Sequence, residues 1–363
     1  MNEKQALLFL SRLPGIGAVK IRTLIAHFGS AKKALEADVS LIAGLPGFNK
    51  ALAETIERGD KNSPNEEDLE LADRDNVSIV SYIDPEYPKR LLDIPDYPVL
   101  LYMKGRLEVA NQPGIAVVGT RTATIYGKEM AAKISRELPL YGLTVVSGLA
   151  RGIDTAAHQG ALVHGKTIAV IGSGLANIYP KENQKLAEKI TEEGILISEF
   201  PMNTKPDRQN FPQRNRIVSG MTLGCLLIEA PQRSGAMITV DRALAQKRKI
   251  FTIPGRADHE NFRGNHLIIK KGQAQLIENA NDILQSFENL LPTPTKTPQK
   301  TNTLVLKPEE QLLIDLLPEQ ETSIEELTLR TKLPIPKLNV LLMSLVLKKV
   351  IKELPGKVYK RNF

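Results

Sequence analysis

The chain has 363 residues, enough for two or three domains with sizeable cores, and its one cysteine, Cys225, excludes a disulfide framework or a cysteine-rich metal site. No apolar run approaches the ~20 residues that span a bilayer, and no signal peptide is recognisable, so we expect a cytoplasmic protein with no membrane partner. The net charge of +7 is uneven, since residues 1–109 carry −3, 110–290 carry +6 and 291–363 carry +4. A basic middle is compatible with a polyanionic partner but does not select a function.

Residues 1–65 predict a small helical domain with an internal duplication. Two segments, 13–30 and 45–59, each run Leu-Pro-Gly, a short turn and then an amphipathic helix. This order resembles the helix-hairpin-helix module, in which backbone N–H groups hold a nucleic-acid phosphate. The N-terminal copy has the glycines and Lys20 that such a contact needs, whereas the copy at 45–59 is degenerate in sequence. A helical domain whose glycines only close turns is an equal alternative.

Residues 66–110 are interpreted as a connector, with short strand-like pieces around a proline-rich middle. From 111 to 287, short apolar strands alternate with amphipathic helices. This alternation predicts an α/β fold with an extended, Rossmann-like, doubly wound and mostly parallel sheet. The expected strands, the last of them a possible edge strand, are 114–118, 143–147, 166–171, 194–198, 222–229, 249–253 and 275–278.

The C-terminal part is expected to be a separate domain on a tether. Residues 288–304 are rich in proline and threonine without periodicity, which is typical of a flexible linker. In residues 305–363 we expect helices at 308–317, 323–331 and 335–347, followed by a two-stranded hairpin. That order is the layout of a winged helix.

Glycine, hydroxyl and arginine residues follow nearly every expected strand. Ligands of open α/β sheets bind beyond the carboxyl ends of the strands, where glycine lets the backbone approach and arginine matches phosphate. One such motif is usually only a tight turn, but five or six on one rim indicate a cleft for phosphates. The residues placed there are Gly119, Thr120, Arg121, Ser147, Gly148, Arg151, Gly172, Gly174, Arg214, Asn215, Arg216, Ser234 and Gly235.

The segment 211–220, FPQRNRIVSG, is expected on a long loop that leads into the strand 222–229. Its two arginines have two interpretations. They face an anionic ligand, or they pair with carboxylates inside the fold, for which Glu199 and Glu229 at strand ends are the candidates.

No catalytic residue, cofactor or metal is expected. The stretch GTRTATIYG lacks the G-x-G-x-x-G pattern of a dinucleotide site, and there is no Walker A motif. Asp154 and His158 lie four residues apart on one expected helix and could form an acid–base pair, but a capping role for Asp154 is the simpler interpretation. The five histidines show no metal-ligand spacing.

These motifs resemble a known family. AVVGTRTATIYG, SGLARGIDTAAHQGAL, GSGLANIYPKEN, SEFP, FPQRNRIVSG, LLIEAPQRSGAMIT and IFTIPG occur in the order, and at about the spacing, of the DNA-processing protein A family (DprA/Smf). The resemblance implies an extended Rossmann domain that binds single-stranded DNA without sequence preference. It also implies protection of incoming DNA in natural transformation, help in loading the RecA recombinase, a homodimer, and no established catalysis.

The resemblance also implies site residues. Gly119, Thr120 and Arg121 match the family's Gly-Ser-Arg phosphate motif, with a hydroxyl kept at Thr120. Phe211 offers a stacking face worth ~1–3 kcal/mol per base, or else anchors its loop in the core. The chain departs from the family at Ala176, in SGAMITVDRAL, and in FRGNHLIIKKGQ, which only loosely matches the dimerisation segment.

Two other function classes share some of these features. A nucleotide-processing enzyme of the lysine-decarboxylase-like phosphoribohydrolase type shares this sheet but carries a Pro-Gly-Gly-x-Gly-Thr-x-x-Glu loop, where this chain reads APQRSGAMITV. A winged-helix transcription factor with a ligand-sensing core would prefer specific duplex DNA, yet residues 307–363 carry a net charge of only +2.

Overall fold

The fold is described from a computed structural model, which covers residues 1–59, 63–288, 306–318, 321–348 and 350–361. The chain divides into two compact units, Met1–Thr295 and Lys296–Phe363, and each is considered by itself. Most of the expected linker, from 289 to 304, lies outside the described residues. Within them, no helix is both long and apolar enough to cross a membrane.

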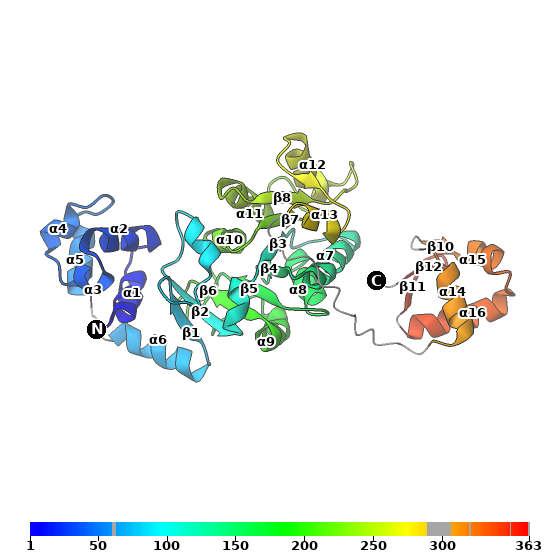
Figure 1. The fold of residues 1–363 in the computed structure, drawn as a ribbon, viewed down its shortest axis with the longest axis horizontal. Helices are drawn as coiled ribbons and strands as arrows, with labels where there is room; N and C mark the ends of the chain where they lie inside the picture. The colour runs from blue at the N-terminus through cyan, green and yellow to red at the C-terminus, as the bar shows by residue number, and fades with distance from the viewer. Residues whose placement is uncertain (60–62, 289–305, 319–320, 349, 362–363) are drawn as a thin grey trace. The chain divides into compact units, whose positions relative to one another are not determined.

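The first unit begins with two helix-hairpin-helix copies (Figure 1). Their hairpins contain Gly15 and Gly47, whose φ angles of +78° and +82° lie in the left-handed region that favours glycine. Both copies therefore have the same backbone turn, although the sequence of the later one is degenerate. In the N-terminal copy the Lys20 ammonium donates to the Gly15 carbonyl at 2.7 Å. The helices are α1 (Glu3–Arg12), α2 (Ala18–Phe28), α3 (Ala31–Leu35), α4 (Val39–Ala43), α5 (Lys50–Arg58) and α6 (Ser63–Arg74).

A nine-stranded sheet forms the centre of this unit, in the order β1-β2-β6-β5-β4-β3-β7-β8-β9. All neighbours from β6 to β9 pair in parallel, whereas β1–β2 and β2–β6 are antiparallel. The mostly parallel, doubly wound sheet that the sequence predicts is confirmed. The strands are β1 (Ser78–Ser81), β2 (Leu100–Gly105), β3 (Gly114–Val118), β4 (Thr144–Ser147), β5 (Thr167–Ile171), β6 (Ile195–Ser198), β7 (Gly224–Leu227), β8 (Lys249–Thr252) and β9 (Gln275–Leu276).

The segment 66–110 is not a connector, because it supplies β1 and β2 to the sheet. Leu101 and Tyr102 are buried, and the Tyr102 hydroxyl contacts the Asp68 carboxylate of α6. Asp68 also accepts the Met202 N–H at 2.9 Å, which attaches α6 to the sheet. The strand-like pieces expected in this segment are therefore strands of the central sheet, paired antiparallel with each other and with β6.

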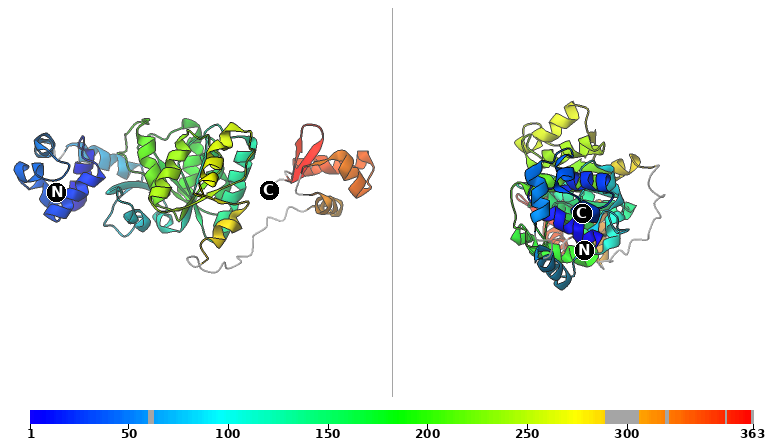
Figure 2. Two further views of the ribbon diagram at one scale, coloured as in Figure 1. Left: turned by 90° about the horizontal axis from the view of Figure 1, so that it is seen from above. Right: turned by 90° about the vertical axis from the view of Figure 1, so that its left-hand side faces the viewer.

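Helices cover both faces of the sheet, with α7, α8 and α9 on one face and α10 and α11 on the other (Figures 1 and 2). The strand order reverses at β3, since β4 lies on one side of it and β7 on the other. Crevices at such a switch point are the usual ligand sites of this architecture. The helices are α7 (Ile125–Glu137), α8 (Ile153–Ala161), α9 (Gln184–Glu193), α10 (Asn210–Gly220), α11 (Gly235–Ala245), α12 (Arg263–Lys270) and α13 (Ala280–Gln285), and the 3₁₀ turns are η1 (Lys89–Asp93), η2 (Leu107–Asn111), η3 (Leu138–Tyr141), η4 (Lys181–Asn183) and η5 (Glu260–Phe262).

The segment 211–220 lies in helix α10, so the expectation of a loop is wrong. Pro212 falls in the first helical turn, where its missing N–H costs no hydrogen bond. Only the later half of the helix carries consecutive buried apolar residues, Ile217 and Val218, so the helical periodicity is weak in the sequence.

The second unit has the expected winged-helix layout. Three helices pack around their own hydrophobic core, and the sheet has the order β10-β12-β11. The elements are α14 (Pro308–Leu316), β10 (Thr322–Ser323), α15 (Ile324–Thr331), α16 (Ile335–Leu347), β11 (Ile351–Leu354) and β12 (Val358–Arg361).

Candidate nucleic-acid interface

A cavity of about 660 Å³ opens at the carboxyl ends of the strands, at the switch point between β3 and β7. Its walls come from the loops after β3 and β4 and from the first turns of α10 and α11. Eight of the residues placed in the phosphate cleft line it, together with Phe211, the expected stacking residue. They are Gly119, Thr120, Arg121, Gly148, Phe211, Arg214, Asn215, Ser234 and Gly235.

Arg151 lies beside this cavity rather than in its wall. It lines a small neighbouring hollow that also includes Arg121, Tyr179 and Phe211. The Arg151 guanidinium donates to both carboxylate oxygens of Glu182, at 2.6 and 2.8 Å. Both side chains are more than half exposed, so a surface phosphate could compete with Glu182 for this arginine.

Three of the expected residues are not in the cavity wall and have packing roles. The buried Ser147 hydroxyl donates to the Val117 carbonyl at 2.7 Å. A side chain at Gly172 would meet the Phe211 ring at 2.8 Å, and one at Gly174 would meet the Met202 carbonyl oxygen at 2.1 Å. Glycine is required at these two positions because neighbouring segments pack closely against the backbone, and not because a ligand approaches there.

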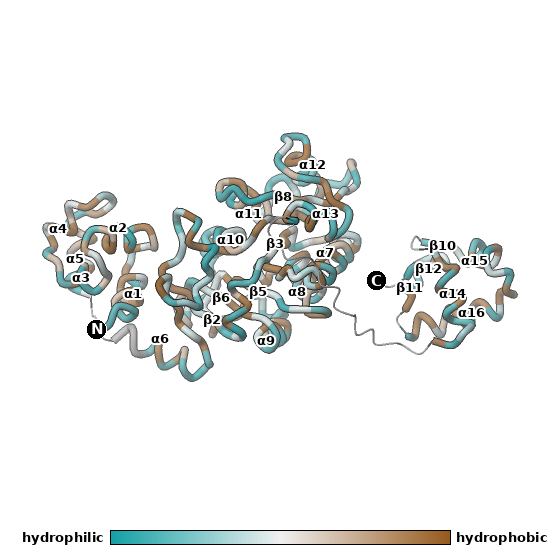
Figure 3. The backbone as a smooth tube through the Cα atoms, viewed as in Figure 1, coloured by the Kyte–Doolittle hydropathy of each residue, from teal (hydrophilic) through white to brown (hydrophobic). Residues whose placement is uncertain are grey.

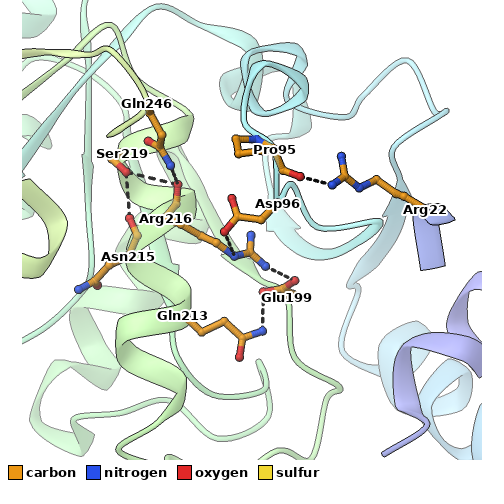
Figure 4. Close-up of polar contacts among 9 residues, drawn as sticks. All are labelled: Arg22, Pro95, Asp96, Glu199, Gln213, Asn215, Arg216, Ser219 and Gln246. Carbon is orange, nitrogen blue, oxygen red and sulfur yellow. Dashed lines mark hydrogen bonds and ion pairs between the residues drawn. The ribbon is translucent and has the colours of Figure 1, made fainter. Parts of the chain in front are cut away.

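Arg216 is not among the residues that line the cavity, and its side chain points toward Glu199 and Asp96 (Figure 4). Its Nη2 lies 2.5 Å from Glu199 Oε1 and its Nε lies 3.6 Å from Asp96 Oδ2. The Arg216 side chain is 6% exposed, and Glu199 also accepts from Gln213 at 3.3 Å. For Arg216 the internal ion pair is therefore the interpretation that the geometry supports.

Arg214 faces the cavity from the opposite side of α10 and is also buried. Its guanidinium donates to the Val170 carbonyl and lies against Gly148, where a Cβ atom would come within 2.2 Å of Nη1. Burial lowers the pKa of Arg214 to about 10, and the charge of Asp154 opposes this change. The guanidinium therefore remains cationic at neutral pH.

Asp154 and His158 form neither an acid–base pair nor a helix cap. Asp154 accepts the backbone N–H groups of Gly148 and Ala150 at 3.1 and 3.3 Å, so it holds the loop before α8. Burial raises the pKa of Asp154, while the charge of Arg214 acts in the opposite direction. His158 Nδ1 contacts the Thr167 hydroxyl at 2.8 Å, and burial lowers the pKa of this imidazole to about 3.

An aromatic and arginine stack crosses the cavity wall. The Arg121 guanidinium lies 5.3 Å from the centre of the Phe211 ring, and the Tyr179 ring centre lies 5.8 Å from that of Phe211. Tyr179 is 40% exposed and Phe211 is half-buried. Aromatic faces of this kind stack on nucleobases in other proteins, and a guanidinium such as that of Arg121 matches the geometry of a phosphate.

The N-terminus of α11 adds hydrogen-bond donors to the same cavity. Ser234 is the N-cap residue, and its hydroxyl has no partner among the described residues. A Cβ atom at Gly235 would meet nothing within 4 Å, so the backbone here is open to a ligand. Unpaired N–H groups and the helix dipole favour an anion at such a position.

Tyr179 and Arg208 also line the cavity, but they were not predicted from the sequence. Both come from long connections and do not directly follow a strand. Arg208 lies two residues before the start of α10, so neither a strand end nor helical spacing marked it in the sequence.

Glu229 does not pair with the arginines. Its carboxylate accepts the Thr124 N–H and hydroxyl, the latter at 2.6 Å, and the Asn261 amide at 2.6 Å. Its backbone carbonyl accepts the Thr120 N–H at 2.7 Å. Glu229 therefore fixes the loop between β3 and α7.

A family model described as DNA recombination-mediator protein A matches residues 78–288. The chain belongs to this family. A tandem helix-hairpin-helix model matches residues 7–56, and a DprA winged-helix model matches 294–357. The resemblance to the DprA/Smf family and the predicted fold class are confirmed.

Relatives in bacteria match half of the chain or more. Protein Smf of Synechocystis is 34% identical over 99% of this chain and 100% of its own length. DprA of Streptococcus pneumoniae is 43% identical over 57% of this chain and 73% of its own length. The crystal structure of the S. pneumoniae protein matches 78% of this chain and 98% of its own, with a TM-score of 0.69 and 34% identity. The structure of DNA processing protein A of Helicobacter pylori, studied for its single-stranded DNA binding mode, matches 60% of this chain and 97% of its own, with a TM-score of 0.54 and 29% identity.

Proposed function

We propose that this chain binds single-stranded DNA, without sequence preference and without cleaving it, in the cavity at the β3–β7 switch point. The observation that carries the proposal is the grouping there of three arginines, Arg121, Arg208 and Arg214, with the rings of Phe211 and Tyr179. Cations hold phosphates, and ring faces stack on any base. Sequence-independent binding follows because neither contact reads a base edge.

The polar groups of the cavity favour binding over catalysis. Among its described lining residues Asp154 is the one carboxylate, and it is occupied by two backbone N–H groups. The phosphoribohydrolase alternative needs a free carboxylate near the glycosidic bond. Glu229, which follows β7, is committed to Thr124 and Asn261.

Family membership supports a wider role for this binding. We infer that the chain protects single strands that enter the cell during transformation, helps to load RecA onto them, and acts as a homodimer. The single-stranded DNA binding studied in the H. pylori relative supports the first step. The rate at which RecA assembles on a single strand, measured with and without this chain, tests the loading step.

The Arg121→Ala variant tests the proposed cavity. Arg121 is exposed and stacks on the half-buried Phe211 ring, so we expect its removal to leave a stable protein with weaker affinity for oligo-dT. The slope of log affinity against log salt should become shallower by about 0.7, the value for one phosphate contact on a single strand.

Arg106→Ala is the matched control. Arg106 is 44% exposed at the opposite edge of the sheet, where it pairs with Glu193. Its loss should leave both affinity and salt slope unchanged. Equal slopes for wild type and Arg121→Ala, in folded proteins, would remove the cavity from the binding path.

A further inference from the structure

A second cavity lies on the same rim of the sheet, outside the one described above. Its volume is about 570 Å³. The carboxyl end of β8, whose apolar residues are brown in Figure 3, and the first turn of α7 enclose it. The rings of Tyr126, His259 and Phe262 line it, and with Pro254 they make its wall mostly apolar. We call this cavity the β8 pocket.

The aromatic rings of the β8 pocket are fixed in place. Phe262 is 3% exposed and forms the floor, and a Cβ atom at Gly255 would meet its ring at 2.0 Å. The ring centres of Tyr126 and His259 lie 6.0 and 6.1 Å from that of Phe262. The Tyr126 hydroxyl donates to the Pro254 carbonyl at 3.0 Å, yet the side chain is 42% exposed. An exposed ring face held in one orientation can stack on a planar ligand without reorganisation of the protein.

Polar groups stand at the edge of this apolar wall. His259 Nδ1 accepts the Asn261 N–H at 3.2 Å, so the neutral imidazole carries its proton on Nε2, where it can donate to a base oxygen. Arg256 donates to both carboxylate oxygens of Asp258, at 3.0 and 2.8 Å. These two side chains are 77% and 69% exposed. Such a surface pair contributes little stability, so a phosphate can compete with Asp258 for the guanidinium.

Glu229 joins the walls of the two cavities. Its carbonyl accepts the Thr120 N–H at 2.7 Å, and its carboxylate accepts the Thr124 hydroxyl at 2.6 Å. Thr120 lines the cavity at the switch point, and Thr124 lines the β8 pocket. Four residues of extended chain span at most ~14 Å, which is the length of about four stacked nucleotides at ~3.4 Å each. A strand that leaves the cavity past the exposed Arg121 of this loop can therefore reach the β8 pocket.

We propose that the single strand bound in the cavity continues into the β8 pocket, where one of its bases stacks on Tyr126. The inference rests on the proposed function and extends the path of the strand. A nucleotide matches the pocket because it joins a planar ring, which suits the aromatic wall, to a phosphate, which suits Arg256. Every base has a flat face, so the contact adds affinity without adding sequence preference. It adds affinity only for strands long enough to fill both cavities.

Oligo-dT of increasing length tests this path in the full chain. The shortest oligonucleotide whose affinity depends on Arg121 marks the length that fills the cavity, and at that length Tyr126→Ala should bind like the wild type. At most about four nucleotides beyond it, Tyr126→Ala should bind about fivefold more weakly or worse, the loss expected for one stacked base. Tyr126→Phe keeps the ring and should bind like the wild type at every length.

Ile125→Ala is the matched control. Ile125 is 72% exposed in the same helical turn but is not among the described residues that line the pocket, so its loss should change no affinity. Circular dichroism checks that each variant is folded. Wild-type affinity of folded Tyr126→Ala at every length, with weaker binding by Arg121→Ala, would overturn the path and leave the proposed function intact. Wild-type affinity of both variants would overturn the two proposals together.

Photocross-linking identifies the base that enters the pocket. One thymine of a long oligo-dT is replaced by 5-iodouracil, position by position, and the attached residue is found by mass spectrometry. We expect attachment to Tyr126 or His259 from one or two adjacent positions of the strand. Free 5-iododeoxyuridine monophosphate should attach much less. Equal attachment of the free nucleotide would assign the pocket to a small ligand and overturn the shared path.

Discussion

Replacing Arg216 by methionine separates a structural arginine from a ligand-binding one. Methionine keeps much of the side-chain volume but leaves Glu199 without its partner 2.5 Å away. The Glu199 side chain is only 14% exposed, so its charge would be held in the interior with only Gln213 as a neighbouring donor. Breaking a buried pair from one side costs about 3–5 kcal/mol, a large share of the 5–15 kcal/mol by which a typical domain is stable.

The same reasoning gives a pH dependence. Burial raises the pKa of Glu199 above 4.5, and the charge of Arg216 opposes that rise. Without Arg216 the pKa rises further, so the folded variant binds the proton more tightly than the unfolded chain does. The penalty is therefore largest at neutral pH and shrinks as the pH falls toward about 4.5.

Urea denaturation followed by circular dichroism at pH 7.5 and pH 5 measures both effects. The double variant Arg216→Met, Glu199→Gln should regain most of the lost stability, because no unpaired charge remains. Its affinity for oligo-dT should match that of the wild type, unlike that of Arg121→Ala. A loss below 1 kcal/mol in Arg216→Met, or no recovery in the double variant, would refute the buried-pair interpretation.

Three further variants probe the cavity and its support. Gly235→Ala should leave the free energy of unfolding unchanged or raise it by about 0.5 kcal/mol, because alanine is a better helix former than glycine. The same variant should bind oligo-dT more weakly in an anisotropy titration, because the added methyl group projects into the open cavity. Gly174→Ala should instead lose about 1–3 kcal/mol of unfolding free energy in urea denaturation, because its Cβ would lie 2.1 Å from the Met202 carbonyl oxygen. The affinity of the folded protein for oligo-dT should not change. A variant as stable as the wild type would contradict the close packing at Gly174. His158 has a pKa of about 3 when folded, against 6.5 normally, so the unfolded chain binds the extra proton and wild-type stability should fall by about 1.4 kcal/mol per pH unit from 6.5 toward 3. His158→Leu lacks the pH dependence that His158 contributes. Parallel plots of unfolding free energy against pH for the two proteins, between pH 7 and 4, would contradict the lowered pKa of His158.

The sequence predicted the parallel strands and the strand-end residues well, because buried parallel strands are continuous apolar runs and their carboxyl ends meet at one edge. That reasoning placed Thr120, Arg121 and Ser234 in one cavity from segments far apart in the chain. It could not separate Arg214 from Arg216. On a loop both arginines can face the ligand, but on helix α10 two residues apart point about 200° apart, so one lines the cavity and the other enters the interior.

Glycines were the other source of error. Gly172 and Gly174 follow a strand as Gly119 does, and the sequence does not show whether a missing side chain makes room for a ligand or for a neighbouring segment. The neighbours that decide it, the Phe211 ring and the Met202 carbonyl, come from 28 or more residues further along the chain. Only tertiary structure brings them together.

The attachment of the β3–α7 loop to Glu229 has a thermodynamic consequence for a flexible polymer. Three hydrogen bonds to Glu229, from the Thr120 N–H and from the N–H and hydroxyl of Thr124, hold the loop in one conformation before any ligand arrives, and a fourth, from Asn261, fixes the Glu229 carboxylate. The entropy lost on association then comes mainly from the strand, because the protein side is already ordered. Each added nucleotide should therefore carry a nearly constant entropic cost, visible by calorimetry as a linear change of binding entropy with oligonucleotide length until the site is filled.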